Sequence, residues 1–367
     1  MDGWLIKFWK MVNRKILIIN NGLAGGGIER ASVSLSNYFS ELGYPVTILA
    51  LYQSKHVFRL NEQIQFIEPK FERTRFNKYY YVLNMMLFIR KNVRKLKPDS
   101  ILSYGEWTNP FVIFALRGLG IPLFLSDRMN PLAKLPFVSE LLRKRLYKKA
   151  TGIIAQTEFA KEILTKRTKS NNIKVIPNPL NLIERVNCES KNIIVSVGRL
   201  SIEKGHKYLI EAFSKVKDKK WKLSIVGDGN ERENLFNLCV QLGIKGRVKF
   251  HGHQKDFSQQ LSESKIFVLP SLKEGFPNAL IEAMAFPLPC ISTDFLGAKN
   301  EIMEDGVNGL IVKTANSEEL ALAIDRLILN IGSLRKKLTE NGVKIREKLC
   351  FEVIAQQYLD FIFNKNE

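Results

Sequence analysis

The segment Lys265–Glu282 constrains the fold of this chain more than any other. Lys265–Pro270 (KIFVLP) is an apolar run of strand length, and Ser271–Gly275 is a short polar turn. Pro277 suits the first turn of a helix, where its missing N–H costs nothing, and the residues after it continue the helix to Phe286. The sequence therefore predicts that a helix N-terminus opens at the carboxyl end of a strand.

Ligands bind at that edge of open α/β sheets, and a helix N-terminus suits a phosphate or diphosphate. Glu274, in the loop, can face the reacting part of such a ligand. Glu282, one turn into the helix, can accept hydrogen bonds from vicinal hydroxyls such as a ribose diol. The alternative is a pair of ordinary surface glutamates, which the Gly-Phe-Pro-Asn between them and the strand before them disfavour.

Apolar runs of strand length alternate with helical periodicity along the whole chain, which predicts parallel sheets. The predicted strands are Lys15–Asn20, Pro45–Leu51, Asp99–Ser103, Pro122–Ser126, Thr151–Gln156, Ile173–Ile176, Asn192–Gly198, Trp221–Val226, Arg247–Phe250, Lys265–Pro270, Pro289–Thr293 and Asn308–Lys313. A length of 367 residues suits two domains. We predict an N-terminal domain at 1–180, a linker at 181–191, a second domain at 192–345 and a C-terminal helical segment at 346–367.

A glycine-rich turn, Asn21–Gly27, separates the first strand from a predicted helix at Ile28–Leu42. Its three consecutive glycines let backbone amides approach a phosphate or an acceptor closely, although a plain structural turn explains them equally well. The turn is not G-x-G-x-x-G, and no acidic residue ends the next strand, so a dinucleotide site is disfavoured.

Three segments resemble the retaining glycosyltransferases of family 4, which have the GT-B fold of two Rossmann-like domains with parallel sheets facing a central cleft. Glu274–Glu282 resembles their E-x7-E motif, Gly198–Gly205 their G-R-L-x-x-x-K-G segment, and Gly26–Arg30 their G-G-x-E-R segment. The resemblance covers almost the whole chain from Lys15 and is strongest from Gly198 to Glu282. It points to bacterial enzymes of capsule, O-antigen or lipid-linked oligosaccharide synthesis, of the N-acetylgalactosaminyltransferase type.

The resemblance implies a role for each matching residue. Arg199 and Lys204 address the nucleotide diphosphate and stabilise its charge as it leaves, and with Glu274 they form the expected catalytic set. Lys204 could instead be a surface lysine at a helix start. The expected donor site comprises Arg199, Lys204, Gly252, His253, Glu274, Gly275, Phe276, Pro277, Asn278 and Glu282, with Gly252 and His253 beside the nucleobase.

The expected acceptor site comprises Gly25, Gly26, Gly27 and Arg128. Many relatives have Glu-His or Glu-Arg where this chain has Asp127-Arg128. An arginine cannot act as a base here but can bind phosphate bidentately, which predicts that Arg128 binds an acceptor diphosphate.

Metal ligands and disulfide patterns do not stand out. The four cysteines are widely spaced with no C-x-x-C, which fits a reducing cytosol. No D-x-D occurs, and His251 and His253 lie two apart, unlike helical metal ligands. We therefore expect a metal-independent reaction and no cofactor.

The net charge of +20 is unevenly placed. Residues 1–180 hold 29 Lys and Arg against 12 Asp and Glu, a net charge of +17, whereas residues 181–367 carry +3. The basic clusters are Arg73–Lys78, Arg90–Lys97 and Arg143–Lys149, and Arg73–Lys97 reads as a basic amphipathic helix that either touches lipid headgroups or is a solvated face. Solubility and lysine-rich codon usage account for part of the total charge but not for its asymmetry.

No apolar run reaches the length that spans a bilayer, and Met1–Met11 reads as a dispensable extension or an interfacial anchor. We expect a cytoplasmic protein, peripheral on the inner face of the plasma membrane, with an anionic membrane surface and no nucleic acid as partner.

The expected function is a retaining glycosyltransferase. It would move a hexosyl or N-acetylhexosaminyl unit from a nucleotide-sugar to a saccharide acceptor in cell-surface polysaccharide synthesis. The family habit indicates a UDP-linked donor, and we expect the acceptor to be linked to a lipid diphosphate. A nucleotide-sugar epimerase of GT-B fold is one alternative, but it gives no reason for a basic acceptor half. A basic nucleic-acid-binding protein is another, without a recognised motif. A non-catalytic relative is disfavoured by the presence together of Arg199, Lys204, Glu274 and Glu282.

Overall fold

The structure is a computed structural model that divides into two compact units. Unit 1 comprises Met1–Pro179 and Glu352–Glu367, and unit 2 comprises Leu180–Phe351. The residues that the structure describes are 13–24, 27–72, 78–133, 135–180, 182–295, 301–330 and 332–363. The segment 181–191, expected as a linker, is part of unit 2.

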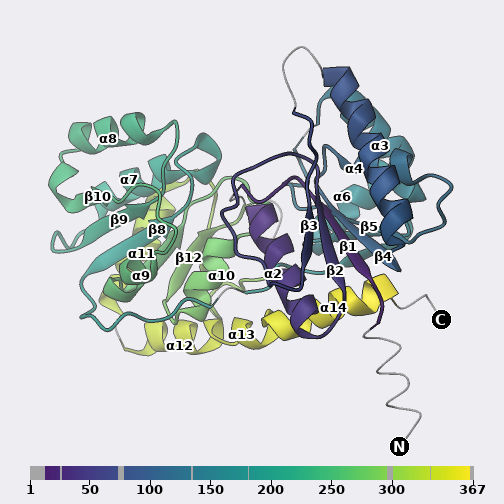
Figure 1. Cartoon of the computed structure of the whole chain (residues 1–367). Helices are drawn as coiled ribbons and strands as arrows, with labels where there is room; N and C mark the ends of the chain where they lie inside the picture. The colour runs from purple at the N-terminus through teal and green to yellow at the C-terminus, as the bar shows by residue number, and fades with distance from the viewer. Residues whose placement is uncertain are drawn as a thin grey trace, which may run out of the picture. The chain divides into compact units, whose positions relative to one another are not determined.

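Unit 1 is built on a seven-stranded parallel sheet of order β3-β2-β1-β4-β5-β6-β7 (Figure 1). Its strands are β1 Ile16–Asn20, β2 Val46–Ala50, β3 Gln65–Ile67, β4 Ser100–Tyr104, β5 Leu123–Ser126, β6 Gly152–Ala155 and β7 Ile173–Val175. Every residue of β1, β4, β5 and β6 is buried, as expected of parallel strands covered on both faces.

Helices cover both faces of this sheet. They are α2 Gly27–Glu41, α3 Lys78–Leu96, α4 Asn109–Leu116, α5 Phe137–Leu146, the 3₁₀ turn η1 Tyr147–Lys149, α6 Glu158–Thr168 and α14 Phe351–Phe363. One apolar core joins the sheet to α3, α4 and α6. The last helix, α14, also packs on unit 1, where the Phe361 ring lies 5.1 Å from that of Phe124 and Phe363 stacks on Tyr44.

Unit 2 repeats the plan on a six-stranded parallel sheet of order β10-β9-β8-β11-β12-β13. Its strands are β8 Ile193–Val197, β9 Lys222–Val226, β10 Val248–Phe250, β11 Ile266–Leu269, β12 Cys290–Thr293 and β13 Leu310–Val312. Its helical elements are η2 Ile202–Lys204, α7 His206–Lys215, α8 Arg232–Gln241, η3 Lys245–Arg247, α9 Ser258–Glu263, α10 Asn278–Ala285, α11 Ser317–Leu329, α12 Ser333–Gly342 and α13 Ile345–Lys348.

Two α/β units on parallel sheets confirm the predicted fold class, and each predicted strand run overlaps one of these strands. The short strand β3 was not predicted. The predicted helix Arg73–Lys97 corresponds to α3, Lys78–Leu96, and residues 73–77 lie outside the described part of the chain.

Candidate active site

Lys204 and Glu274 form a close ion pair at the carboxyl edge of the unit 2 sheet. Lys204 Nζ lies 2.7 Å from Oε1 and 2.8 Å from Oε2 of Glu274, although the two residues are 70 positions apart in the sequence. Glu274 is buried and Lys204 is partly buried. The structure thus brings together two of the three residues predicted to be catalytic.

The backbone around Gly205 places Lys204 at this position. Gly205 adopts φ +67° at the start of α7, and a Cβ atom there would lie 2.0 Å from the carbonyl oxygen of Pro270, at the end of β11. Leu272 N donates to Glu203 O at 2.8 Å, which joins the same two loops. Only glycine permits this close approach, so Gly205 allows the loop that carries Lys204 to pack directly against the loop that carries Glu274.

Buried hydroxyls support the Glu274 carboxylate. Ser271 Oγ donates to Glu274 Oε1 at 2.7 Å, and Thr293 Oγ1, at the end of β12, donates to Ser271 O. Ser271 is fully buried. The carboxylate is therefore contacted by Lys204, after β8, and by Ser271, after β11, while Thr293 of β12 holds the backbone of Ser271.

Helix α10 begins directly after this carboxylate. Pro277 is its N-cap residue, and in the described part of the chain the backbone N–H groups of Gly275 and Phe276 donate no hydrogen bond. Asn278 is exposed at the first helical position, whereas Glu282, one turn later, is buried. Two free N–H groups at a helix N-terminus make a suitable place for a phosphate group.

The remaining residues predicted for the donor site lie at neighbouring strand ends. Arg199, two residues after β8, is exposed. Gly252 follows β10 with φ +70° and accepts a hydrogen bond from Gly227 N at 2.8 Å, and His253 after it is exposed. All of these residues therefore follow strands of one parallel sheet and lie at its carboxyl edge.

His206, the first residue of α7, was not singled out from the sequence. It is buried, and neither of its ring nitrogens has a hydrogen-bond partner among the described residues. Burial, together with the charge of Lys204, lowers the pKa of His206 to about 4. The imidazole is therefore neutral at physiological pH.

In unit 1, the Arg128 side chain is held by several partners. Its guanidinium donates to Ser126 Oγ at 3.1 Å, Asn178 Oδ1 at 2.6 Å and the Tyr358 hydroxyl at 2.9 Å. It also lies over the Tyr104 ring, 5.1 Å from the centroid. These contacts tie the loop after β5 to α14, so Arg128 has a structural function whether or not it also binds an acceptor.

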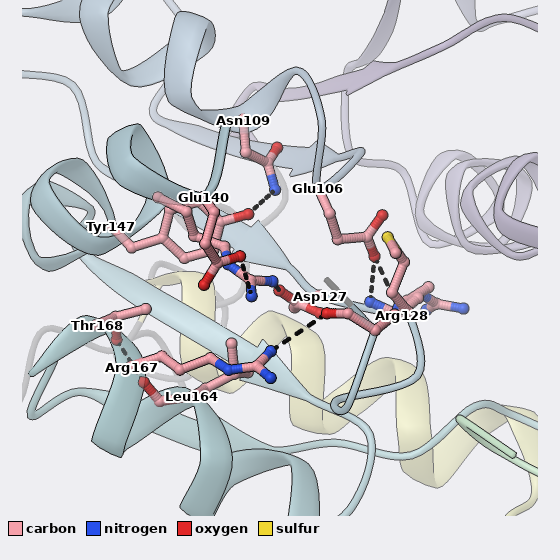
Figure 2. Close-up of polar contacts among 12 residues, drawn as sticks. Glu106, Asn109, Asp127, Arg128, Glu140, Tyr147, Leu164, Arg167 and Thr168 are labelled. Carbon is pink, nitrogen blue, oxygen red and sulfur yellow. Dashed lines mark hydrogen bonds and ion pairs between the residues drawn. The ribbon is translucent and has the colours of Figure 1, made fainter. Parts of the chain in front are cut away.

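Two buried carboxylates flank that loop (Figure 2). Glu106, after β4, accepts hydrogen bonds from the backbone N–H groups of Arg128 and Met129, at 2.5 and 2.9 Å. Asp127 faces Arg143, whose Nη1 lies 3.8 Å from Asp127 Oδ2 and whose Nη2 lies 2.8 Å from Glu140 Oε2. Sequence analysis counted Arg143 in the basic cluster Arg143–Lys149, and the structure shows that its side chain is buried.

Burial, reinforced by the charge of Glu106, raises the pKa of Asp127 to about 8, although Arg143 and Arg167 act in the opposite direction. Burial, together with the charges of Asp127 and Glu106, raises the pKa of Tyr147 well above its ordinary value. Glu106 and Asp127 were not predicted as site residues, though each follows a strand at the carboxyl edge, which is the signal that would have found them.

The glycine-rich turn is only partly described. Gly25 and Gly26 lie outside the described residues, and Gly27 is the first residue of α2. In the described part of the chain, no group of three or more His, Cys, Asp or Glu side chains is placed to hold a metal ion.

Comparison with known proteins matches both halves of the chain to families. Residues 182–345 match the family described as glycosyl transferases group 1, and residues 25–184 match the one described as glycosyltransferase family 4. The chain is 30% identical over 351 residues to an uncharacterized glycosyltransferase of Haemophilus influenzae, covering 93% of this chain and 97% of that protein.

A second relative has a stated reaction. The chain is 26% identical over 359 residues to a Campylobacter jejuni α-1,4-N-acetyl-D-galactosaminyltransferase that acts on GalNAc-GalNAc-diNAcBac-PP-undecaprenol, covering 95% of this chain and 98% of that protein.

Solved structures share the fold. A glycosyltransferase of Rickettsia africae superimposes with a TM-score of 0.79 at 20% identity, covering 96% of this chain and all of that one. Anabaena HepE in complex with UDP and glucose gives a TM-score of 0.77 at 18% identity, covering 95% and 99%.

Proposed function

Because this chain belongs to the glycosyltransferases with the GT-B fold, we propose that it moves a hexosyl or N-acetylhexosaminyl unit from a UDP-sugar to a lipid-diphosphate-linked saccharide, with retention of the anomeric configuration. The single observation that supports the donor half best is the Lys204–Glu274 pair beside the N-terminus of α10.

This pair can serve both ends of a nucleotide-sugar. An ammonium group has three N–H donors, so two contacts with Glu274 leave one N–H of Lys204 for a diphosphate oxygen. Glu274 would face the sugar, and the exposed Arg199 would add a second positive charge at the diphosphate. The N–H groups of Gly275 and Phe276 would bind phosphate oxygens, Glu282 would hold the ribose diol, and Gly252 and His253 would flank the base.

The reaction then depends on positioning and charge. The bond between the anomeric carbon and the diphosphate oxygen breaks, and a bond from that carbon to the acceptor oxygen forms on the same face. The acceptor hydroxyl proton passes to the leaving diphosphate. Arg199 and Lys204 stabilise the negative charge that develops there, and no protein nucleophile is required.

Relatives support the choice of acceptor and donor. The Campylobacter jejuni relative described above and a second one, 27% identical over 324 residues, are both named for undecaprenol-diphosphate acceptors. A 24% identical Erwinia amylovora relative is named for amylovoran biosynthesis. HepE was crystallised with UDP. No helix among the described residues is long and apolar enough to cross a membrane. We place the protein on the cytosolic membrane face, with the acceptor on unit 1 and no metal or other cofactor.

A hydrolysis screen of UDP-sugars and GDP-sugars with purified protein tests the donor, followed by transfer to undecaprenyl-diphosphate saccharides. The anomeric proton coupling of the product tests retention. Epimerised nucleotide-sugar formed from donor alone would overturn transfer in favour of an epimerase. Binding to duplex DNA with no turnover of any donor would favour a nucleic-acid-binding protein instead.

A further inference from the structure

Helix α3 exposes a continuous row of large apolar side chains followed by basic ones. The exposed fractions are 89% for Tyr79, 66% for Tyr80, 51% for Leu83 and 56% for Leu87. Lys91, Arg94 and Lys95 are also exposed, one and two turns further along. We call these seven residues the α3 stripe.

The opposite face of the helix explains why the stripe is held outward. Tyr81, Met85, Ile89 and Val93 recur every four residues and are buried in the unit 1 core. A helix fixed by that face must present positions 80, 83, 87, 91 and 94 to the surroundings, because they recur at helical spacing on the other side. Figure 1 shows α3 on the outside of unit 1.

The structure also defines which basic residues belong to this surface. Arg90 is turned toward α4, where its Nη1 donates to Ala115 O at 2.7 Å and to Arg117 O at 2.9 Å. Arg90 therefore caps the end of α4 and is not part of the stripe. Among the described side chains of α3, Lys91, Arg94 and Lys95 remain as the exposed cations.

The apolar end of the α3 stripe lies at the carboxyl edge of the unit 1 sheet. Helix α3 connects the parallel strands β3 and β4, so it begins at the edge of the sheet where the strands end. The loops that hold Glu106 and Arg128 follow β4 and β5 at the same edge. Tyr79 and Tyr80 thus lie on the side of unit 1 where the acceptor is proposed to bind.

We propose that the α3 stripe docks unit 1 onto an anionic bilayer, with its tyrosines and leucines in the interfacial layer and its basic residues against anionic headgroups. This rests on the proposed function, since a lipid-linked acceptor keeps its tail in the membrane. Tyrosine suits the headgroup level, and a helix with apolar and Lys/Arg-rich parts suits the interface plane.

A second copy of the chain fits this surface less well. A symmetric contact through α3 would either set the cations of the two copies against each other or cover them with the partner's leucines. The first arrangement is repulsive, and the second removes charges from water without a counter-ion. Anionic lipid instead supplies negative charge beside the basic end and an apolar layer beside the other.

Co-sedimentation of the full chain with phosphatidylcholine vesicles, with and without phosphatidylglycerol, tests the proposal at low and high salt. We expect the wild type to bind phosphatidylglycerol vesicles and to retain part of that binding at about 1 M salt, where charge contacts beyond about 3 Å are screened. The variant Y80S/L83S/L87S should lose the salt-resistant part. K91Q/R94Q/K95Q should bind phosphatidylglycerol vesicles roughly 100-fold more weakly at low salt.

Matched controls lie on unit 2. L322S/L329S changes two exposed leucines of α11, and K220Q/K222Q/K249Q removes three exposed lysines, so neither variant should alter vesicle binding. Hydrolysis of the donor without vesicles should be unchanged in every variant, which also shows that the variants are folded.

Wild-type binding by both stripe variants would overturn the docking surface, as would a wild type that ignores both vesicles. Loss of a dimer in Y80S/L83S/L87S with unchanged vesicle binding would show a second copy as the occupant. Failure of the wild type to hydrolyse any nucleotide-sugar would instead overturn the proposed function, with the docking surface still decided by the vesicle assay.

Discussion

Lys204 Nζ bridges both carboxylate oxygens of Glu274, at 2.7 and 2.8 Å, from a loop that lies 70 residues earlier in the chain. The charge expected at the diphosphate and the carboxylate expected at the sugar are therefore parts of one contact. Each orients the other, so a change at either residue should affect both functions.

This coupling predicts non-additive kinetics. Lys204→Ala and Glu274→Ala should each lower kcat by about 10²-fold or more, because each removes a preorganised charge and leaves its partner unpaired. The rise in activation free energy in the double variant should be smaller than the sum of the two single rises, by roughly 0.5–3 kcal/mol. Measured kcat values complete the cycle, with Lys207→Ala as an exposed lysine control on α7. Additive losses, or near-normal turnover in either single variant, would contradict the prediction.

Arg199→Ala should also lower kcat on the order of 10²-fold, through the loss of charge at the diphosphate. Arg199 is exposed and has no ion pair among the described residues, so this change should leave the thermal stability of unit 2 almost unaltered. Turnover and the melting temperature, measured together, separate the two effects. Loss of stability in parallel with loss of activity would argue against a direct role.

Glu282 and Glu274 should differ in nucleotide binding. Glu282→Ala should weaken binding of UDP alone, because a ribose contact is lost, whereas Glu274→Ala should reduce transfer more than UDP affinity. Calorimetry with UDP decides between them. Equal losses of affinity in the two variants would defeat the assignment, and Glu263→Ala, on α9 of the same unit, serves as the control.

Asp127 predicts a pH dependence of stability. Its pKa is raised to about 8 in the folded protein by burial and by Glu106, so the folded state binds a proton that the unfolded state releases at lower pH. The free energy of unfolding should therefore fall as pH rises from about 4 to about 8. Asp127→Asn stays neutral and should flatten this dependence, whereas Glu158→Gln, on an exposed side chain, should not. Identical urea-unfolding profiles of Asp127→Asn and wild type across this range would refute the assignment.

Arg128 lets structural and acceptor roles be separated. Arg128→Ala should destabilise unit 1 by about 2–4 kcal/mol, because buried partners lose charged hydrogen bonds. Tyr358→Phe removes one of these bonds but keeps the guanidinium. If Arg128 also binds the acceptor diphosphate, Tyr358→Phe should lower stability and leave the KM for acceptor near normal. If the KM for acceptor rises in both Arg128→Ala and Tyr358→Phe, the cause is a shift of the loop after β5 and not a lost contact between Arg128 and the acceptor diphosphate.

Much of the candidate site on unit 2 could be predicted from sequence because its segments are local. The strand, loop and helix around Glu274 are contiguous, and their residue types alone indicate the order of elements. Gly205 was part of a motif, but the contact with Pro270 that requires glycine joins two distant loops and has no local signal. Likewise His206 reads as an ordinary first residue of a helix until its burial is known.

The polar cluster around Arg128 in unit 1 was harder to predict because its partners come from separated segments. Glu106, Asp127 and Arg143 lie on three loops or helices, and no spacing pattern joins them. Arg90 and Arg143 each lie in a run of basic residues, yet Arg90 caps α4 and Arg143 pairs with Asp127 and Glu140. Charge runs show how many cations there are, whereas burial decides which of them reach the surroundings.

Unit 1 is interrupted in sequence, since unit 2 lies between Pro179 and Glu352. During synthesis, the sheet of unit 1 leaves the ribosome long before α14, whose Tyr358, Phe361 and Phe363 complete its packing and hydrogen bonding. Residues translated after unit 2 are thus needed to complete unit 1, whereas unit 2 can fold from a continuous stretch. A nonsense codon at the junction of unit 2 and α14 would therefore damage unit 1, although it lies after all the strands of that unit.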